Sequence, residues 1–188
     1  EEKRARLAAA PVNPELVYWE MSERLSDDSL IAVDTGMSTT FFARALKVRH
    51  GMKVAVSGML ATMGPAISFA AAAKFALPYR PALALVGDGA MQMLGINSLI
   101  TVGKYWKRWP DPRFIVVVLN NGDLNMVSWE LRALGGSPKL PQTQDVPPFD
   151  YAGYAELLGF TGLRIARPGD VQPALDQAFA ARRPVLVD

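Results

Sequence analysis

The sequence predicts an α/β fold: a doubly wound, mostly parallel sheet with helices on both faces. Short apolar segments of strand length alternate with segments of helical periodicity over most of the chain. Two apolar segments, 82–86 and 114–119, read as buried strands, and each ends abruptly in small or polar residues. Because the carboxyl ends of parallel strands meet at one edge, we expect a ligand site where these two strands end.

Composition and charge exclude several classes of protein. Of the 188 residues, 50% are hydrophobic and 20% charged, which is typical of a globular domain with a sizeable core. The net charge of +2 gives no reason to expect nucleic acid or an anionic membrane as partner. The chain has no cysteine, so disulfides and thiolate metal sites are excluded. The N-terminus lacks the apolar core of a signal peptide, and the most apolar helical stretch, 66–73, is too short to span a bilayer. We therefore expect a cytoplasmic protein.

The first half of the chain is predicted to contain two strands and three helices. The charged, alanine-rich residues 1–12 are typical of a linker or tail, and residues 13–188 then form the domain. Pro14 and Pro65 suit helix starts, because proline fixes a helical φ and the first turn does not need its N–H. Ser38 is a candidate N-cap. The expected elements are helix 14–25, strand 29–33, helix 41–46, strand 53–56 and helix 65–75.

The second half continues the alternation of strand and helix. Residues 135–148 contain two glycines and four prolines, so we expect a loop, and its length suggests a lid or a mobile entrance. Asp170 is a candidate N-cap for the last helix. The expected elements are strand 82–86, helix 92–106, strand 114–119, a helix of about two turns within 122–134, helix 151–158, strand 162–165, helix 170–181 and strand 184–187.

The motif Gly87-Asp88-Gly89 directly follows one of the two buried strands. The glycines let the backbone turn sharply and approach a ligand closely. The helix that starts after Gly89 has free N–H groups and a dipole that favour an anion. The other buried strand ends in Asn120 and Asn121. A carboxylate beside a phosphate-binding helix start suits Mg²⁺ and a diphosphate, since Mg²⁺ prefers oxygen ligands.

Thirty residues separate this motif from Asn120-Asn121, and the whole pattern resembles the signature of thiamine-diphosphate enzymes. From about Val12 onward the chain resembles the diphosphate-binding domain that lies C-terminal in the pyruvate oxidase, acetolactate synthase and 2-oxo acid decarboxylase group. The resemblance implies that Mg²⁺ is bound by the side chains of Asp88 and Asn121 and by the backbone carbonyl of Asp123. Two alternatives stay open: Asp88 as a helix cap, and Asn121 as a turn residue. We expect the Asp123 side chain to be solvated.

The resemblance also implies cofactor contacts from several loops. Two positions depart from the family pattern: Ala90 stands where serine or another small residue is frequent, and Ala61 where glycine is frequent. Ser38 either supplies the hydroxyl donor that Ala90 lacks or serves only as a helix cap. The expected cofactor-binding residues are Gly36, Met37, Ser38, Ala61, Met63, Gly87, Gly89, Ala90, Asn121 and Leu124.

Met63 falls where the family places a bulky apolar residue under the cofactor. Such a side chain wedges between the pyrimidine and thiazolium rings and holds them bent. The bend lets the 4'-amino group reach the thiazolium C2 proton, so that the cofactor acts as its own general base. The alternative is that Met63 only fills the core.

Other polar residues carry weaker signals. His50, the only histidine, lies in an expected surface turn. Residues 104–109 mix basic and aromatic side chains, as nucleic-acid binders do, but cations at a helix C-terminus also complement its dipole. Ser128 has no partner histidine within reach, which disfavours a nucleophile.

The resemblance covers only one part of such an enzyme. Catalysis in the family needs a glutamate from a separate pyrimidine-binding domain, and nothing in this sequence matches that domain. We therefore expect a fragment of a longer three-domain enzyme that is inactive alone. At full length it would be a homodimer or homotetramer, with the cofactor bridging to the pyrimidine-binding domain of a neighbouring subunit. FAD is possible in the full-length protein but would not be bound by this chain.

The sequence thus predicts a domain that binds thiamine diphosphate and Mg²⁺ in a 2-oxo acid-processing enzyme. The segment 120–130 and the proline-rich loop after it look closest to pyruvate oxidase-like and acetolactate synthase-like proteins. Decarboxylation would be followed by oxidation or transfer to an acceptor. One alternative is a benzoylformate decarboxylase-like or aldehyde lyase-like activity. A second is a non-catalytic nucleotide-binding module, although neither Gly-x-Gly-x-x-Gly nor a Gly-Lys-Ser/Thr loop is present.

Overall fold

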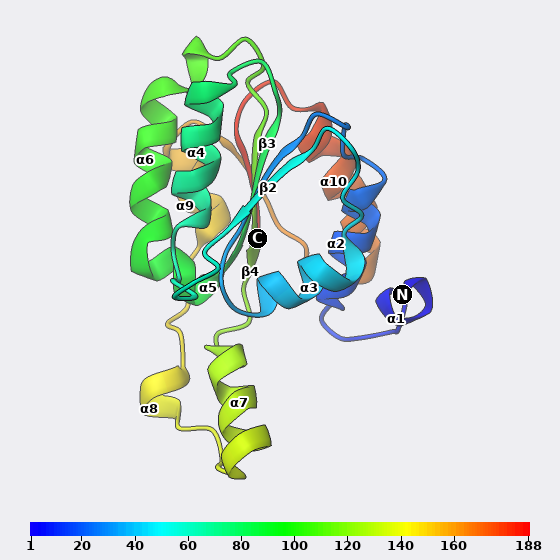
Figure 1. Ribbon diagram of the computed structural model, residues 1–188, viewed down its shortest axis with the longest axis vertical. Coiled ribbons are helices and arrows are strands. Elements are labelled where there is room, and N and C mark those ends of the chain that lie inside the picture. Colours follow the sequence, from blue (N-terminus) through cyan, green and yellow to red (C-terminus); the bar gives the residue numbers. More distant parts are fainter.

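A single sheet of six parallel strands forms the centre of the molecule (Figure 1). The computed structural model describes residues 1–188. The strand order is β2-β1-β3-β4-β6-β5, and every neighbouring pair is parallel, which confirms the predicted doubly wound fold. The strands are β1 (Leu30–Val33), β2 (Lys53–Val56), β3 (Ala82–Gly87), β4 (Phe114–Leu119), β5 (Thr161–Leu163) and β6 (Val185–Val187).

Helices cover both faces of this sheet (Figure 1). One face carries α4 (Ala66–Ala76), α6 (Ile96–Tyr105) and α9 (Tyr151–Leu157), and the other carries α2 (Pro14–Ser22), α3 (Met37–Ala45) and α10 (Val171–Ala180). Successive residues of a central strand enter opposite cores: Leu83 packs with the second group of helices and Ala84 with the first. Central strands are therefore apolar throughout, because both of their faces are buried.

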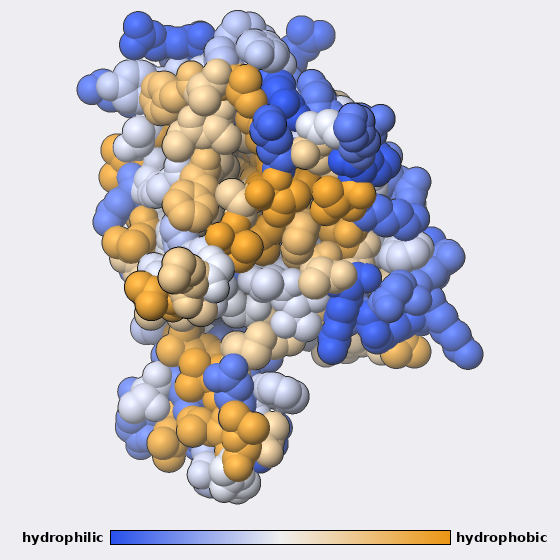
Figure 2. Space-filling model, viewed as in Figure 1, coloured by the Kyte–Doolittle hydropathy of each residue, from blue (hydrophilic) through white to orange (hydrophobic).

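The second strand, β2, lies at an edge of the sheet, and all four of its residues are exposed. Val56 is 46% exposed, and Phe75 on the neighbouring helix α4 is 52% exposed. Figure 2, in the same orientation as Figure 1, shows apolar side chains gathered across the middle of the side of the molecule that faces the viewer, where β2 crosses in Figure 1. The helices lack the combination of length and apolar character that a membrane-spanning segment requires.

Two helices extend away from the sheet as an arm (Figure 1). The arm consists of α7 (Asn125–Gly135) and the short α8 (Pro141–Gln144). The helix α7 has 11 residues and is longer than the two turns expected. It ends at Gly135, and the C-cap Gly136 has a φ of 62°, the left-handed conformation that stops a helix. The segment 135–148, expected to be a loop, contains the helix α8.

Several element boundaries differ from the prediction. The helix α3 begins at Met37, with Gly36 as N-cap, so the assignment of Ser38 as N-cap is wrong. The helical segment after β3 begins at once with α5 (Asp88–Ala90), continues as a π-helix (Met91–Gly95) and runs into α6, well before the expected start. At the N-terminus, α1 (Glu2–Ala5) lies within the expected linker, and Arg4 Nε donates to Glu15 at 2.6 Å. Asp170 occupies the N-cap position of α10 but makes no side-chain capping bond; its carboxylate accepts the N–H groups of Ala166 and Arg167.

Candidate functional site

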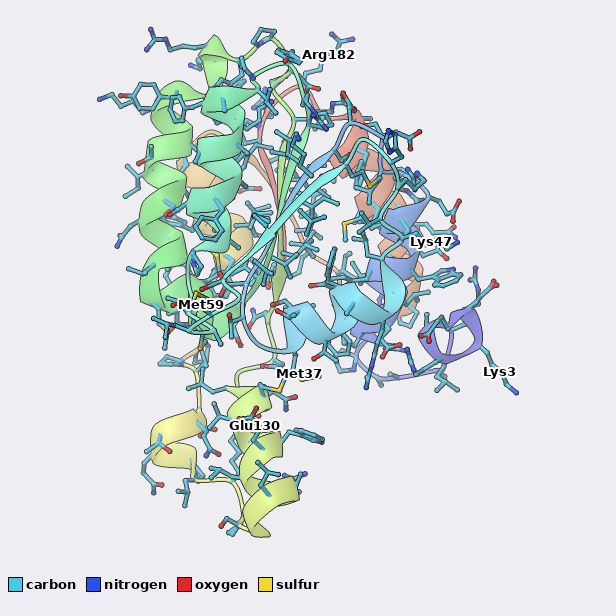
Figure 3. All side chains as sticks on the ribbon, in the orientation of Figure 1. Lys3, Met37, Lys47, Met59, Glu130 and Arg182 are labelled. Carbon is cyan, nitrogen blue, oxygen red and sulfur yellow. The ribbon has the colours of Figure 1, made fainter.

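The carboxyl-terminal edge of the sheet collects the loops that carry the predicted site residues. In Figure 3, Met37, the first residue of α3, and Met59, in the loop after β2, lie at the same end of the molecule as the arm that carries Glu130. Arg182 lies at the opposite end. The strands β3 and β4 are adjacent, with Gly87 opposite Leu119, so the two halves of the sequence motif do meet.

The Asp88 carboxylate joins these two halves directly. It is 3% exposed, and its Oδ2 accepts the backbone N–H of Asn121 at 3.0 Å and that of Gly122 at 2.6 Å. Its Oδ1 accepts the N–H of Gly89 at 2.8 Å. The N-cap of α5 is Gly87, so the alternative of Asp88 as an N-cap is wrong. Burial raises the pKa of the Asp88 carboxyl, although these three N–H groups act in the opposite direction. A cation nearby would stabilise the charged form.

The loop after β4 brings the other two expected metal ligands beside Asp88. The side-chain oxygen of Asn121 accepts the N–H of Asp123 at 3.0 Å, so the amide shapes the turn, and the residue as a whole is exposed. Nowhere in the chain do three or more His, Cys, Asp or Glu side chains gather in a way that could hold a metal ion. The available donors are one carboxylate, one amide oxygen and backbone carbonyls. This set fits Mg²⁺, which usually keeps phosphate or water oxygens as further ligands.

The expectation that the Asp123 side chain is solvated is wrong, because three neighbouring side chains engage it. Lys139 Nζ lies 3.0 Å from its Oδ1, Ser128 Oγ donates to the same oxygen at 2.8 Å, and Asn125 Nδ2 donates to Oδ2 at 3.1 Å. Burial acts to raise the pKa of this carboxyl, but the bonds from Lys139, Asn125 and Ser128 outweigh it and hold the pKa below its ordinary value. Lys139 also pairs with Asp145 at 2.6 Å. The Asp123 carboxylate therefore ties the arm to the loop after β4. Only the backbone carbonyl of Asp123 is left for a metal.

Three apolar side chains converge on Gly89. A Cβ built on this glycine would lie 3.4 Å from Met63 Cε and 3.6 Å from Val146 Cγ2, and it would overlap Leu124 Cδ2. The structure therefore brings together Met63, Gly89 and Leu124, three of the residues expected to bind the cofactor. Met63 is half-buried and also packs against the core beneath α4 and α6, so its contacts are consistent with a wedge and with core filling.

The first loop is built differently from the expectation for Ser38. The Ser38 hydroxyl donates to the backbone carbonyl of Asp34 at 2.9 Å, and Ser38 is only 1% exposed. The hydroxyl hydrogen is therefore already engaged within the loop. Gly36 has φ of 119°, a conformation that L side chains rarely adopt, so the turn into α3 requires glycine. The N–H of Gly89 also has a partner within the chain already, because it donates to the Asp88 carboxylate.

Two buried residues that the sequence analysis missed form hydrogen bonds to the backbone at this edge of the sheet. Asp34, directly after β1, is fully buried, and its carboxylate accepts backbone N–H groups from two loops. Tyr151, on α9, is also fully buried, and its hydroxyl donates to the Asp88 carbonyl at 3.2 Å. A signal for Asp34 was present, since it follows a buried strand as Asp88 does. Tyr151 carried none, because it lies 63 residues away from its partner in sequence.

Ala61, an expected cofactor contact, has a strained backbone. Its φ of 46° makes it the only residue other than glycine with a positive φ. An L side chain in this region costs about 1 kcal/mol relative to glycine, and glycine is what the family often has here. The strain lies in the loop that also carries Met63.

We expect Ala61→Gly to stabilise the chain. Relief of the left-handed strain should outweigh the greater backbone freedom of glycine in the unfolded chain, for a net gain of roughly 0.5 kcal/mol. Thermal denaturation of the variant beside Ala72→Gly, an exposed alanine inside α4, checks this. The control should lose about 0.5–1 kcal/mol, as glycine does within a helix. A loss at Ala61 as large as that at Ala72 would contradict the strain.

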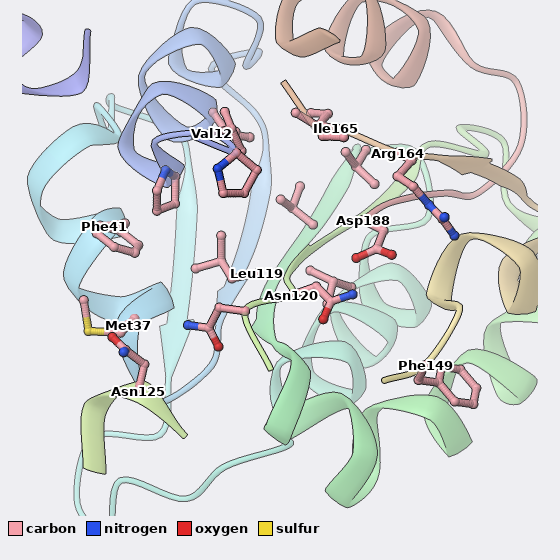
Figure 4. Close-up of a pocket in the computed structure, with 18 of the residues that line it drawn as sticks. Val12, Met37, Phe41, Leu119, Asn120, Asn125, Phe149, Arg164, Ile165 and Asp188 are labelled. Carbon is pink, nitrogen blue, oxygen red and sulfur yellow. The ribbon is translucent and has the colours of Figure 1, made fainter. Parts of the chain in front are cut away.

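A cavity of about 860 Å³ opens beside the predicted site (Figure 4). Met37 and Asn125 lie at one end of it and Asp188 at the other. Its walls are mainly apolar, and Arg164 at its rim pairs with Asp150 at 2.6 Å. Neither Asp88 nor Met63 lines it, so the cavity adjoins the turn at Asp88 and does not lie over it.

Comparison with known proteins identifies a protein family and several relatives of this chain. Residues 34–188 match the family described as "Thiamine pyrophosphate enzyme, C-terminal TPP binding domain". The whole chain is 34% identical to a putative thiamine pyrophosphate-containing protein, YdaP, of Bacillus subtilis and covers 31% of it. It is 29% identical to the large subunit of acetolactate synthase isozyme 3 of Escherichia coli, with 89% of the chain and 28% of the relative covered.

A solved structure shows the same fold. A thiamine diphosphate-dependent 4-hydroxybenzoylformate decarboxylase of Rhodococcus jostii RHA1 superposes with a TM-score of 0.82 at 24% identity. The superposition covers 96% of this chain and 33% of the decarboxylase. The chain therefore spans about a third of the length of the relatives that it matches.

Proposed function

The chain belongs to the thiamine pyrophosphate (thiamine diphosphate, TPP) enzymes as a C-terminal TPP-binding domain, and on this premise we propose that it binds Mg²⁺ and the diphosphate of TPP where β3 and β4 end. The observation that carries the proposal is the Asp88 carboxylate, buried and bonded to the N–H groups of Asn121 and Gly122. It holds together two loops that each offer oxygen donors.

The chain's own residues would act by holding and orienting the cofactor. Asp88 and Asn121 would bind the metal through side-chain oxygens, and Asp123 through the carbonyl that its clamped side chain leaves free. Met63, whose side chain lies near Gly89 as that of Leu124 does, would support the bent shape of the cofactor. When bound, TPP supplies the carbon nucleophile that attacks a 2-oxo acid.

We place this domain in a longer subunit that processes 2-oxo acids in the manner of pyruvate oxidases or acetolactate synthases. Support comes from the acetolactate synthases among the relatives and from their roughly threefold greater length. The pyrimidine-binding domain of a neighbouring subunit would cover the open side of the site. Met59 and Leu60, in the same loop as Met63, are 99% and 87% exposed and are apolar residues that such a partner would bury. With the family shown, no observation favours a nucleotide-binding module.

The test is a calorimetric titration of the 188-residue chain with TPP. We expect magnesium-dependent binding with a dissociation constant of roughly 0.1–1 mM, because one wall of the site is missing. Thiamine, which lacks the diphosphate, is the matched control ligand and should not bind. With pyruvate added, the chain should release no carbon dioxide above the rate of cofactor alone.

Three results would contradict the proposal. They are the absence of binding at several millimolar TPP, binding that does not need Mg²⁺, and equal binding of thiamine. Carbon dioxide release by the chain alone would show that one of its own glutamates acts on the cofactor. In that case the role proposed for the pyrimidine-binding domain would be wrong.

A further inference from the structure

Asp34 occupies a central position between two of the loops of the proposed site. It directly follows β1, and its side chain is fully buried. Its Oδ1 accepts the N–H of Gly64 at 2.8 Å and that of Thr35 at 2.9 Å, and its Oδ2 accepts the N–H of Ala66 at 3.0 Å. The carboxylate thus ties the end of β1 to the loop that leads into α4.

The bond to Gly64 is the important one, because Gly64 immediately follows Met63. The peptide group that joins these two residues is the one that Asp34 grips. Gly64 has φ of 100°, so the chain makes a turn here that needs glycine. Earlier in the loop the tie is local: Thr62 N–H donates to Ser57 Oγ at 3.2 Å. Asp34 is therefore the anchor between this loop and the sheet.

The same residue also holds the first loop. Its backbone carbonyl accepts the hydroxyls of Ser38 at 2.9 Å and Thr39 at 2.6 Å. Side chain and main chain of one residue thus set the spacing between the start of α3 and the Met63 loop. A buried carboxylate that accepts three N–H groups is held rigidly, because it would have to give up all three bonds to move.

A carboxylate suits this position better than an amide. The two oxygens of Asp34 both accept, and asparagine can offer only one acceptor of this kind. If the asparagine oxygen replaced Oδ1, its NH₂ group would face the N–H of Ala66, and two donors would oppose each other. The substitution keeps the size of the side chain and removes one anchoring bond, so it perturbs the loop selectively.

We propose that Asp34 is a positioning residue of the cofactor site and that it acts through Met63. The carboxylate fixes the position and orientation of the Met63 loop relative to the turn at Asp88. Met63 in turn would set the shape of the bound cofactor. The inference rests on the proposed function, since Met63 matters to catalysis only if TPP binds there. It assigns to Asp34 no contact with the cofactor or the metal.

The first test is hydrogen exchange of the 188-residue chain, which needs no cofactor. In Asp34→Asn the backbone amides of residues 58–66 should exchange about tenfold faster or more, while those of β3 and β4 stay unchanged. Asp28→Asn, an exposed aspartate just before β1, is the matched control and should leave all these amides as they are. Unchanged exchange in the Met63 loop of Asp34→Asn would overturn the proposal.

The second test is a double-mutant cycle in the longer subunit. Alone, Asp34→Asn and Met63→Ala should each lower kcat about tenfold or more, with smaller effects on the affinity for TPP and Mg²⁺. If Asp34 acts through Met63, the two losses should not multiply, and Asp34→Asn should change kcat less than about twofold when Met63 is already alanine. Multiplying losses would assign Asp34 a general role in the fold and refute the coupling.

A second variant guards against loss of folding in Asp34→Asn. Gly64→Ala displaces the same peptide group and keeps the buried carboxylate. Alanine is strained at a φ of 100°, and its Cβ would lie 2.9 Å from Leu94 Cβ. It should show the same local rise in exchange and the same non-additivity with Met63→Ala. The exchange result does not depend on TPP, so failure of this inference and failure of the proposed function are distinguishable.

Discussion

Replacing Asp88 with asparagine is expected to weaken magnesium-dependent TPP binding by more than about a hundredfold in the longer subunit. The substitution removes the only carboxylate among the proposed metal ligands. It also places an NH₂ group where Oδ2 now accepts the N–H of Asn121 and of Gly122. The loop after β4 would then move away, and Asn121 would leave the position from which it could bind the metal.

Isothermal titration with TPP at fixed Mg²⁺ measures this effect. Asp145→Asn is the matched control, because this exposed carboxylate pairs with Lys139 and is not among the proposed metal ligands. We expect the control to change the affinity less than about fivefold. Affinity in Asp88→Asn within a few fold of the wild type would refute the metal site, provided that the melting temperatures show both variants folded.

Replacing Lys74 with methionine is expected to lower the free energy of unfolding by about 2–4 kcal/mol. Lys74 lies on α4 and is fully buried. Its Nζ donates to the carbonyls of Pro78 at 3.1 Å, Arg80 at 2.6 Å and Asp111 at 2.6 Å. An ammonium has three hydrogens, so all of them are used. Methionine would fill the space but leave these carbonyls without this donor.

Urea denaturation followed by circular dichroism tests the stability prediction. The transition midpoint should fall while the slope of the free energy against denaturant stays the same, since the fold is unchanged. Lys104→Met, an exposed lysine on α6, serves as the control and should stay within about 0.5 kcal/mol of the wild type. Equal stability of the two variants would mean that water satisfies the three carbonyls when the ammonium is removed.

The alternation of apolar strands and amphipathic helices was enough to predict the architecture. The segment 114–119 is strand β4 to the residue, and 53–56 is β2 to the residue. Local pattern succeeds here because a strand of a parallel sheet is recognisable by its own residues and the polar or small residues that end it. The same logic placed Asp88 beside Asn121, since neighbouring parallel strands end at one edge of the sheet.

Contacts between distant segments were decided only by the tertiary structure. Nothing near Asp34 in sequence shows that its carboxylate would hold Gly64, and nothing near Asp123 shows that Lys139 would clamp it. Local sequence sets periodicity and turns, whereas a buried carboxylate takes whichever donors the packed chain brings to it.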